Sequence, residues 1–523
     1  MTLSAKPSPS SSTVDLEHEA ALKQPHGDLV ARHEHETPRT PTSAVGRVWH
    51  SLSSQVGLEG HGVAPLTDAE RADSKFWQNF TLWLAMNGTI SCFSTGTLGP
   101  LLFELSLRDS ALVILFFNLF SCSLPAYFAV WGPRLGMRQM GIARYSYGYL
   151  GAILPAALNL ITFIGFCAIN AILAGQVLAA VKPGSISVSV GIVIIAVVSL
   201  VISFCGYRVM HACEKWAWIP VIFSFVMLAG FGGRHLDAAP AFQPGRASAG
   251  AILSWASLIV GFSISWTGCA ADFNTYMHRN VSSIKVFAYT FAGLYLPCVL
   301  IQTMGAAFAA AAMSGLVSTW ETAFTESSVG GLVGVALEPL HWFGKVLLVF
   351  FALGIICNNA PTIYAFSLSL QIVFPYLQAL PRFIFPVVGT AIYLPIAIVG
   401  ASHFATALSN FLGLIGYWAS LFATVVLVEH LVFRRNRWTE YNVDVWNSLK
   451  GLPCGVAALT SSFVGAALVV LSMDQVWWRG PIAKAVTGPE ATHGGDIAIW
   501  TGMAATAVAY VPLRSLEKRL TGR

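Results

Sequence analysis

The chain has 523 residues, of which 55% are hydrophobic and only 11% are charged, and its net charge is +5. An average soluble domain is about 25% charged, so this composition excludes an ordinary soluble protein. Apolar runs of about 20 residues, the length that crosses a bilayer, recur along the chain. Lipid offers the backbone no hydrogen bonds, so segments that cross it must be helices or closed barrels, and continuous apolar runs favour helices. The sequence therefore predicts an all-α polytopic membrane protein.

The first 75 residues have a different character from the rest. Ser, Pro, His and acidic residues dominate residues 1–75, and no long apolar run occurs there. Such a segment buries too little apolar surface to offset the entropy of ordering it. It also lacks a basic start followed by an apolar core, so it is not a secretory signal peptide. We expect a disordered tail over 1–75, a transporter domain over 76–513 and a short tail over 514–523.

Apolar windows predict about twelve membrane helices. They centre near residues 87–99, 112–127, 154–177, 188–205, 217–231, 252–269, 286–307, 346–368, 383–399, 408–428, 454–473 and 497–511. If the amino terminus is cytoplasmic, the loops on that side hold more than twice as many Lys and Arg residues as the opposite loops. Basic residues favour cytoplasmic loops. This distribution predicts that both termini are cytoplasmic.

Two apolar helices carry glycine-containing polar stretches at matching positions. The first predicted helix contains FSTGTLGP at 93–100, and the sixth contains SWTGCAADF at 265–273. Small residues such as Gly96 and Gly268 also permit close helix packing in membranes. The matched offset of five helices favours the alternative, in which both helices are interrupted near the middle of the membrane, as in many transporters.

The same offset relates asparagines of the third and eighth predicted helices. Asn170 lies in the third, and Asn358 and Asn359 lie in the eighth, shortly before Pro361. An amide in mid-membrane faces protein or water, because lipid gives it no partner. A helix–helix hydrogen bond is one interpretation. Pro361 removes a backbone donor beside the two amides, which favours a binding site.

Together these residues predict a cavity for a flat, neutral ring. Trp266 in the sixth helix would supply a stacking face worth roughly 1–3 kcal/mol. The amides donate and accept hydrogen bonds at once, and Ser94 adds a hydroxyl. The cavity has few formal charges and no basic cluster, so it suits neither anions nor lipids. We expect a small-molecule partner and the lipid bilayer, and no nucleic acid.

Asp272 is a carboxylate within the sixth apolar helix, near its predicted cytoplasmic end. Carboxylates inside membranes are functional candidates by default. Asp272 could carry a proton, form an inner-gate contact, or pair with Arg or Lys. Its place near the helix end favours the structural or gating role.

Four stretches resemble a known family. They are WTGCAADFNTYM, NNAPTIYAFSLSLQ, LIGYWASLFATVVLVEHLVFRR and the ending YVPLRSLEKRLTGR. These are similar to fungal purine–cytosine permeases of the nucleobase–cation symporter family 1, from about residue 76 to the carboxyl terminus. The resemblance implies an inverted repeat of five plus five helices with helices 1 and 6 broken, and two additional helices. This is the amino acid–polyamine–organocation type of fold.

The resemblance also implies roles for individual residues. In the family, a helix-6 Trp stacks on the base and Asn residues of helices 3 and 8 bind it, which here are Trp266, Asn170, Asn358 and Asn359. Pro361 and Ser94 are associated with the same site. The implied activity is proton-driven uptake of cytosine, adenine, guanine and hypoxanthine at the plasma membrane. Departures at Cys269, Phe273, Asn274 and His278 leave open another flat heterocycle, such as a vitamin B6 compound or another pyrimidine.

Other classes of function fit the sequence less well. It contains no HExxH, GxSxG or Cys/His metal set, so we expect neither an enzyme nor a metal site nor a cofactor. A channel or a transporter-like sensor is the rival on physical grounds. In helix 8, Cys357 and Asn358 stand where a sodium site would favour a Ser-Thr pair, which agrees with coupling to H+. The sequence leaves the oligomeric state open.

Overall fold

The computed structural model describes residues 62–204, 215–241, 247–380, 384–488, 491 and 494–523. The first helices are α2 (Gln78–Asn87), α3 (Ile90–Phe103), α4 (Leu107–Ala129), α5 (Trp131–Leu135), α6 (Gln139–Gly151), α7 (Ile153–Val181), α8 (Val188–Phe204) and α10 (Trp218–Gly232). They are followed by α11 (Ala249–Ile264), α12 (Ser283–Ala312), α13 (Ser318–Ala336), α14 (Trp342–Gly354), α15 (Ile356–Val373), α16 (Ile384–Gly400) and α17 (Phe404–Val428). The last are α18 (Val456–Ser472), α19 (Pro481–Thr487) and α20 (Ala498–Thr521), with a short antiparallel pair, β1 (Asp474–Gln475) and β2 (Trp478–Arg479), before α19.

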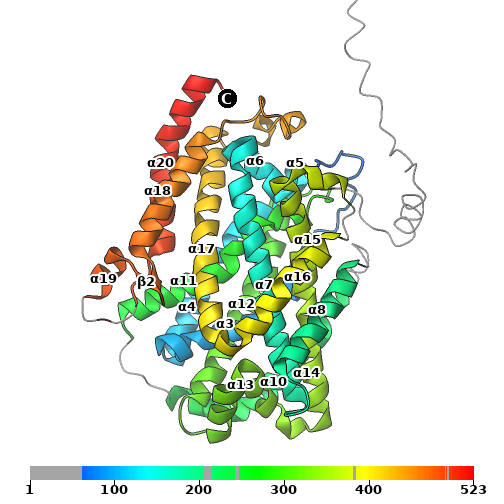
Figure 1. Ribbon diagram of the computed structural model, residues 1–523, viewed down its shortest axis with the longest axis vertical. Helices are drawn as coiled ribbons and strands as arrows, with labels where there is room; N and C mark the ends of the chain where they lie inside the picture. The colour runs from blue at the N-terminus through cyan, green and yellow to red at the C-terminus, as the bar shows by residue number, and fades with distance from the viewer. Residues whose placement is uncertain (1–61, 205–214, 242–246, 381–383, 489–490, 492–493) are drawn as a thin grey trace, which may run out of the picture. The chain divides into compact units, whose positions relative to one another are not determined.

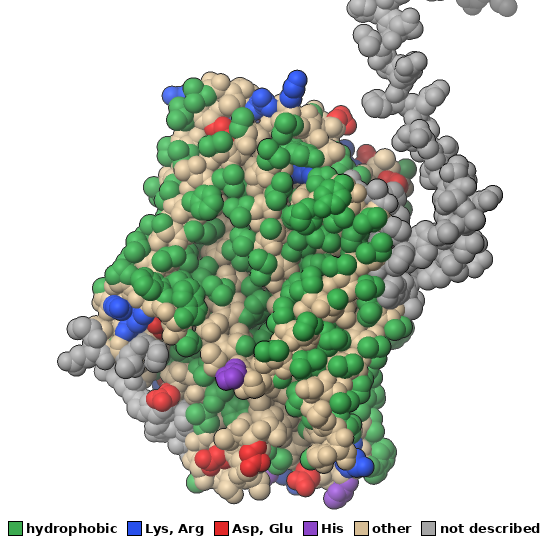
Figure 2. Space-filling view, viewed as in Figure 1, with side chains coloured by type: hydrophobic (Ala, Val, Ile, Leu, Met, Phe, Trp, Pro, Cys, Tyr) green, Lys and Arg blue, Asp and Glu red, His purple; other side chains and the backbone are tan. Residues whose placement is uncertain are grey.

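The helices present an apolar surface. Large apolar side chains stand exposed on them, among them Ile161 at 65%, Leu300 at 68% and Val399 at 78%. Apolar side chains cover the middle of the face in Figure 2, whereas charged side chains gather mainly toward its two ends. A soluble protein rarely exposes apolar area on this scale. The exposed side chains therefore face lipid, and the protein is an all-α polytopic membrane protein.

The predicted apolar windows all fall on helices. Each of the twelve overlaps at least one helix of the structure. In the described part of the chain, seven helical stretches are long and apolar enough to cross a membrane, and three further apolar helices are shorter. The number of crossings stays a prediction.

The two ends of the helix bundle differ. We call the end that carries α5 and the carboxyl terminus the tail end, and the end that carries α13 the loop end (Figure 1). Between them α12 packs along α2, α3 and α4, while α7 packs against α8 and α15. The contact of α7 with α15 brings the predicted third and eighth helices together, and so positions their asparagines.

The first membrane helix is interrupted, but not at Gly96 as the sequence suggested. Helix α3 runs without a break through Gly96. The chain leaves the helix earlier, at Gly88 (φ −75°, ψ 53°) and Thr89 (φ −127°, ψ 166°). A Cβ at Gly96 would lie 1.9 Å from the backbone oxygen of Gln302 in α12. Gly96 therefore serves close helix packing, and its prediction as a helix break is wrong.

The sixth membrane helix loses its α-helical form within the predicted stretch. Helix α11 ends at Ile264 and continues as two 3-10 turns, Ser265–Gly268 and Ala270–Phe273. Between them Cys269 has φ −145° and ψ 4°, outside the helical region. Gly268 thus lies in the interruption, next to the residue where the backbone turns away.

The predicted amino-terminal tail is too long. Residues 1–61 lie outside the described residues, but 62–76 pack against the transporter at its tail end. Val63, Leu66 and Arg71 are buried there, and Asp73 forms a parallel β-bridge with Met277. The Arg71 guanidinium donates to the carbonyl oxygen of Pro133 at 2.9 Å. Three buried side chains and backbone pairing suffice to order this segment despite its low overall hydrophobicity.

The predicted carboxyl-terminal tail over 514–523 is also corrected. Helix α20 continues to Thr521, and two of the residues in its last two turns, Arg514 and Glu517, are buried. Arg514 is buried and its Nε lies 3.0 Å from Oε2 of Glu429. Glu517 accepts hydrogen bonds from the backbone N–H groups of Gly455 and Ala457, both at 2.9 Å.

Candidate substrate-binding site

Trp266 lies at the interruption of helix 6, among aromatic rings. Its ring is nearly parallel to that of Phe166 on α7, with an interplanar angle of 13° and centroids 6.0 Å apart. The ring of Trp83 meets it edge-on at 5.5 Å. Its indole N–H donates to Oδ1 of Asn87 at 3.2 Å. The indole is therefore fixed in orientation by both broken helices, because Asn87 ends α2.

The three predicted asparagines are in direct contact. The side-chain amide of Asn170 donates to Oδ1 of Asn358 and to Oδ1 of Asn359, each at 2.9 Å. Asn170 in turn accepts a hydrogen bond from the Ser91 hydroxyl. The Asn358 amide donates to the backbone oxygen of Met86, beside the helix-1 interruption. Helices 1, 3 and 8 thus meet at one buried amide cluster.

Several polar groups in this region are buried without a hydrogen-bond partner among the described residues. Among them are the Nδ2 donor of Asn359 and the hydroxyl of Ser94. Ser94 stands one helical turn after Ser91, so both lie on the same face of α3. An unpaired buried group costs about 1–3 kcal/mol. A ligand that bonds these groups would recover that free energy.

Sequence reasoning missed three residues of this site. They are Asn87, Ser91 and Phe166, which contact Trp266 or Asn170. Helical spacing could have indicated two of them: Ser91 is three residues before Ser94, and Phe166 is four residues before Asn170. Asn87 carried no such signal, because its position depends on a helix break that the sequence placed elsewhere.

Gly268 and Pro361 occupy different surroundings. The backbone oxygen of Gly268 accepts from the Asn159 amide of α7 at 3.0 Å, and Asn159 also donates to the Ser369 hydroxyl of α15 at 3.1 Å. The opened backbone of helix 6 is thereby tied to helices 3 and 8. Pro361 lies inside α15, which runs through it; helix 8 changes between α14 and α15 at Ile355 instead.

Asp272 lies toward the tail end, away from the amide cluster in sequence and structure. Its carboxylate accepts from the backbone N–H of Gln139 at 2.6 Å, and its backbone oxygen accepts from Arg138 at 2.6 Å. The Arg138 guanidinium also lies over the rings of Tyr276 and Tyr364, at 5.3 and 5.6 Å. These contacts connect the end of the sixth membrane helix, after α11, to the start of α6 and to α15.

An apolar surface, two interrupted helices and a buried polar site between them define a membrane transporter. Residues 65–483 match the family described as "Permease for cytosine/purines, uracil, thiamine, allantoin". The chain belongs to this family of permeases, as the resemblance predicted, and is a transporter rather than an enzyme.

Individual relatives agree with this assignment. Purine-cytosine permease fcyB of Emericella nidulans is 34% identical over 478 residues, covering 90% of this chain and 91% of the relative. Purine-cytosine permease FCY21 of Saccharomyces cerevisiae is 33% identical over 502 residues, covering 95% and 93%. Vitamin B6 transporter TPN1 of the same yeast is 30% identical over 520 residues, covering 90% and 89%.

A solved structure shares the fold. Mhp1, a nucleobase-cation-symport-1 family transporter, in a closed conformation with bromovinylhydantoin bound, superposes with a TM-score of 0.64 at 18% identity. The match covers 88% of this chain and 96% of that one. The similarity extends over nearly the whole helical bundle.

Proposed function

We propose that this permease carries cytosine and the purine bases adenine, guanine and hypoxanthine across the plasma membrane by alternating access, coupled to protons. The observation that carries the proposal is the buried amide cluster of Asn170, Asn358 and Asn359, with Trp266 at the neighbouring helix break. The names of the fungal relatives, purine-cytosine permeases, support this substrate class.

The chemistry of the site suits a flat ring with hydrogen-bonding edges. A base can stack on the Trp266 indole, while amide groups match its donors and acceptors. In the structure Asn170 already bonds Asn358 and Asn359, so a ligand must replace those bonds. A ring without polar edges would leave buried amides unpaired, at about 1–3 kcal/mol for each group. The same cost selects for bases and against plain aromatic rings.

We assign Asp272 a structural or gating role in the transport cycle. Its contacts join the end of the sixth membrane helix, after α11, to the start of α6 (Gln139–Gly151). We propose that this tail end of the bundle, with both termini, is cytoplasmic. Opening toward the cytoplasm requires these contacts to separate. The Gly268 backbone oxygen accepts a hydrogen bond from Asn159 of α7, and this bond keeps the break of the sixth membrane helix attached to α7 during that motion.

A vitamin B6 compound is the second candidate substrate. The observation that favours it is the 30% identity to vitamin B6 transporter TPN1 over nearly the whole chain. Pyridoxine is also a flat heterocycle with polar substituents, so the same indole and amides could bind it. Identity to the purine-cytosine permeases is higher, and we therefore rank nucleobases first.

Uptake of radiolabelled cytosine in cells without their own nucleobase carriers tests the proposal. We expect saturable uptake that a protonophore abolishes and that unlabelled adenine or hypoxanthine inhibits. Uptake of pyridoxine instead of cytosine would transfer the function to the second candidate. Unsaturable flux that ignores the protonophore would indicate a channel. Base binding without accumulation would indicate a sensor.

A further inference from the structure

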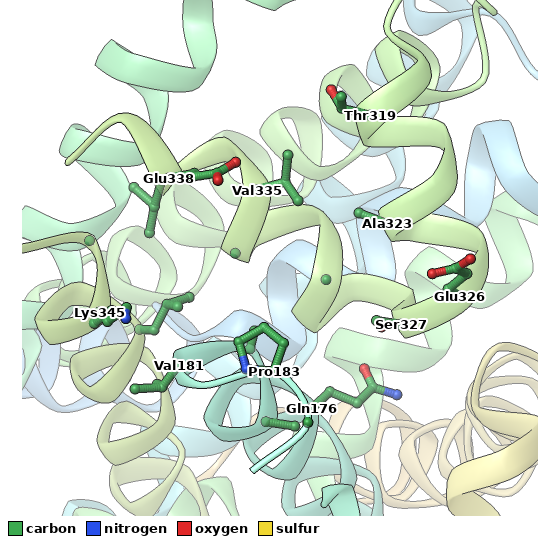
Figure 3. A pocket seen from close by; sticks show the side chains of 18 of the residues that line it. Gln176, Val181, Pro183, Thr319, Ala323, Glu326, Ser327, Val335, Glu338 and Lys345 are labelled. Atoms are coloured by element: carbon green, nitrogen blue, oxygen red, sulfur yellow. The ribbon is translucent and has the colours of Figure 1, made fainter. Parts of the chain in front are cut away.

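Two cavities at the loop end share one wall. The first, of about 1030 Å³, lies among the end of α7, α13 and the start of α14 (Figure 3). The second, of about 880 Å³, lies between α13 and the residues that begin α17. Both are lined by Gln176, Val188, Glu326 and Ser327. The side chains common to both cavities therefore border both of them.

Gln176 is a buried amide aimed at this shared wall. Its side chain is 6% exposed, and its Oε1 has no hydrogen-bond partner among the described residues. In Figure 3 it extends from α7 toward the part of α13 that carries Ser327 and Glu326. Buried polar groups are nearly always bonded, so an unpaired acceptor calls for an explanation. A ligand that donates a hydrogen bond supplies one.

The backbone of α13 is shaped around Gln176. Helix α13 is kinked at Ser328, which has φ 55° and ψ −147°. Two residues later, a Cβ at Gly330 would lie 2.4 Å from the backbone carbon of Gln176. A non-glycine residue held with positive φ is strained and persists only where its surroundings impose that conformation. The kink and the glycine together hold Glu326 and Ser327 over the end of α7.

The groups at this wall have the chemistry to hold a base. The Glu326 carboxylate can accept two hydrogen bonds side by side from the adjacent N–H donors of guanine, or one from the exocyclic amine of cytosine or adenine. The Gln176 oxygen accepts a further one. Phe324 and Phe404 add aromatic surface in the second cavity. Glu338 and Lys345 lie across the first cavity from Glu326 (Figure 3).

We propose that Gln176, Glu326 and Ser327 form a second, outer binding site for heterocyclic bases that carry an exocyclic amine. Gln176 follows Asn170 by six residues on α7, which is about 9 Å along the helix. A base at the outer site therefore waits roughly one and a half turns from the amide cluster. This inference rests on the proposed function, because it assigns the same substrate class to a second site.

Equilibrium binding of radiolabelled cytosine to the purified full-length protein tests the inference by stoichiometry. Wild type is expected to bind two bases per chain. Trp266→Ala weakens the buried site about 5- to 150-fold, and Gln176→Leu with Glu326→Gln removes the outer one, so at a cytosine concentration just sufficient to fill both wild-type sites each variant binds about one base. Glu326→Gln alone lowers outer-site affinity about tenfold or more, since hydrogen bonds to charged groups contribute about 1.5–3 kcal/mol.

Glu338→Gln is the matched control, because it removes a carboxylate from the opposite wall and should leave two bases bound. Suppose that wild type bound one base per chain, and that Trp266→Ala lost this base while the Gln176/Glu326 variant kept it. The outer site would then be refuted and the proposed function would stand. If the protein neither bound nor transported any base, both the proposed function and this inference would be refuted. Retained Trp266-dependent binding shows that the outer-site variant is folded.

Discussion

At the scale of single residues, the site contains two kinds of polar group. Asn170 and Asn358 are satisfied by their neighbours, whereas the Ser94 hydroxyl and the Asn359 Nδ2 are buried without a partner in the described part of the chain. Satisfied groups stabilise the empty protein, and a ligand must compete for them. Unsatisfied buried groups lower the stability of the empty protein and are available to a ligand. Removal of the two kinds should therefore have different consequences.

Ser94→Ala and Ser91→Ala separate these consequences. Ser94→Ala is expected to weaken cytosine binding while leaving thermal stability unchanged or slightly raised, since its hydroxyl has no partner. Ser91→Ala removes the donor to Asn170, so it should lower both binding and stability, the latter by about 1–3 kcal/mol. Binding isotherms and thermal melts of the purified variants measure both. Equal effects of the two substitutions on stability would contradict this division.

At the scale of elements, the contact of α3 with α12 depends on glycines on both sides. A Cβ at Gly96 would lie 1.9 Å from the Gln302 oxygen, and one at Gly305 would lie 2.0 Å from the Phe93 oxygen. The two backbones approach at these points as small-residue interfaces in membranes do. The interface holds the part of helix 1 that follows the break, and therefore positions Ser91 and Ser94.

Gly96→Ala should separate α3 from α12. We expect a loss of about 1–3 kcal/mol from overpacking, seen as a lower thermal midpoint and reduced surface expression. Gly230→Ala on α10 is the control, because its Cβ would meet no atom within 4 Å and alanine favours a helix by up to about 1 kcal/mol. A tolerated Gly96→Ala would mean that this interface is not close-packed.

The end of helix 6 invites a test of Asp272. Asp272→Asn keeps an oxygen for the Gln139 N–H bond, so a structural or gating role predicts uptake that still responds to a protonophore. Asp272→Ala removes that acceptor and should reduce uptake strongly. Parallel measurement of cytosine-dependent proton entry checks both variants. If Asp272→Asn abolished proton entry while cytosine still exchanged, Asp272 would instead be the proton carrier.

At the scale of the whole molecule, Asp496 joins parts of the chain that are distant in sequence. It lies between α19 and α20, and its carboxylate accepts from the hydroxyls of Tyr417 on α17 and Ser257 on α11. It also accepts from the backbone N–H of Asp474 in β1 at 3.2 Å. Burial raises the pKa of Asp496 to about 6. The last two helices are thereby tied to the rest of the bundle by a titrating group.

The raised pKa makes stability depend on pH. In the unfolded chain an aspartate titrates near pH 3.9, so between about pH 4 and 6 the unfolded state loses this proton while the folded state keeps it. Stability from this group is therefore fully present below about pH 4 and falls as pH rises to about 6, by on the order of 2–3 kcal/mol. Thermal melts of wild type and of Asp496→Asn at a series of pH values measure the difference in stability between the two proteins. A flat difference across this range would contradict the raised pKa.

Much of the architecture and site could be predicted because membrane constraints are simple. Apolar windows fell on helices, and Asn170, Asn358 and Asn359 meet as expected, because buried amides need partners. The break in the first membrane helix could not be placed from the sequence, because a glycine can mark either an interruption or a close helix contact. Only the position of α12 shows that Gly96 serves close packing. The packing of residues 62–76 against the transporter could not be predicted from the sequence either, because a few buried side chains do not change the polar composition of the segment.

The initial rate of cytosine uptake as a function of concentration, in wild type and Trp266→Ala at matched surface expression, tests the central claim most directly. Loss of a stack worth roughly 1–3 kcal/mol should raise the half-saturating concentration about 5- to 150-fold. An unchanged half-saturating concentration in Trp266→Ala would remove the indole from the site and with it the proposed mode of base recognition.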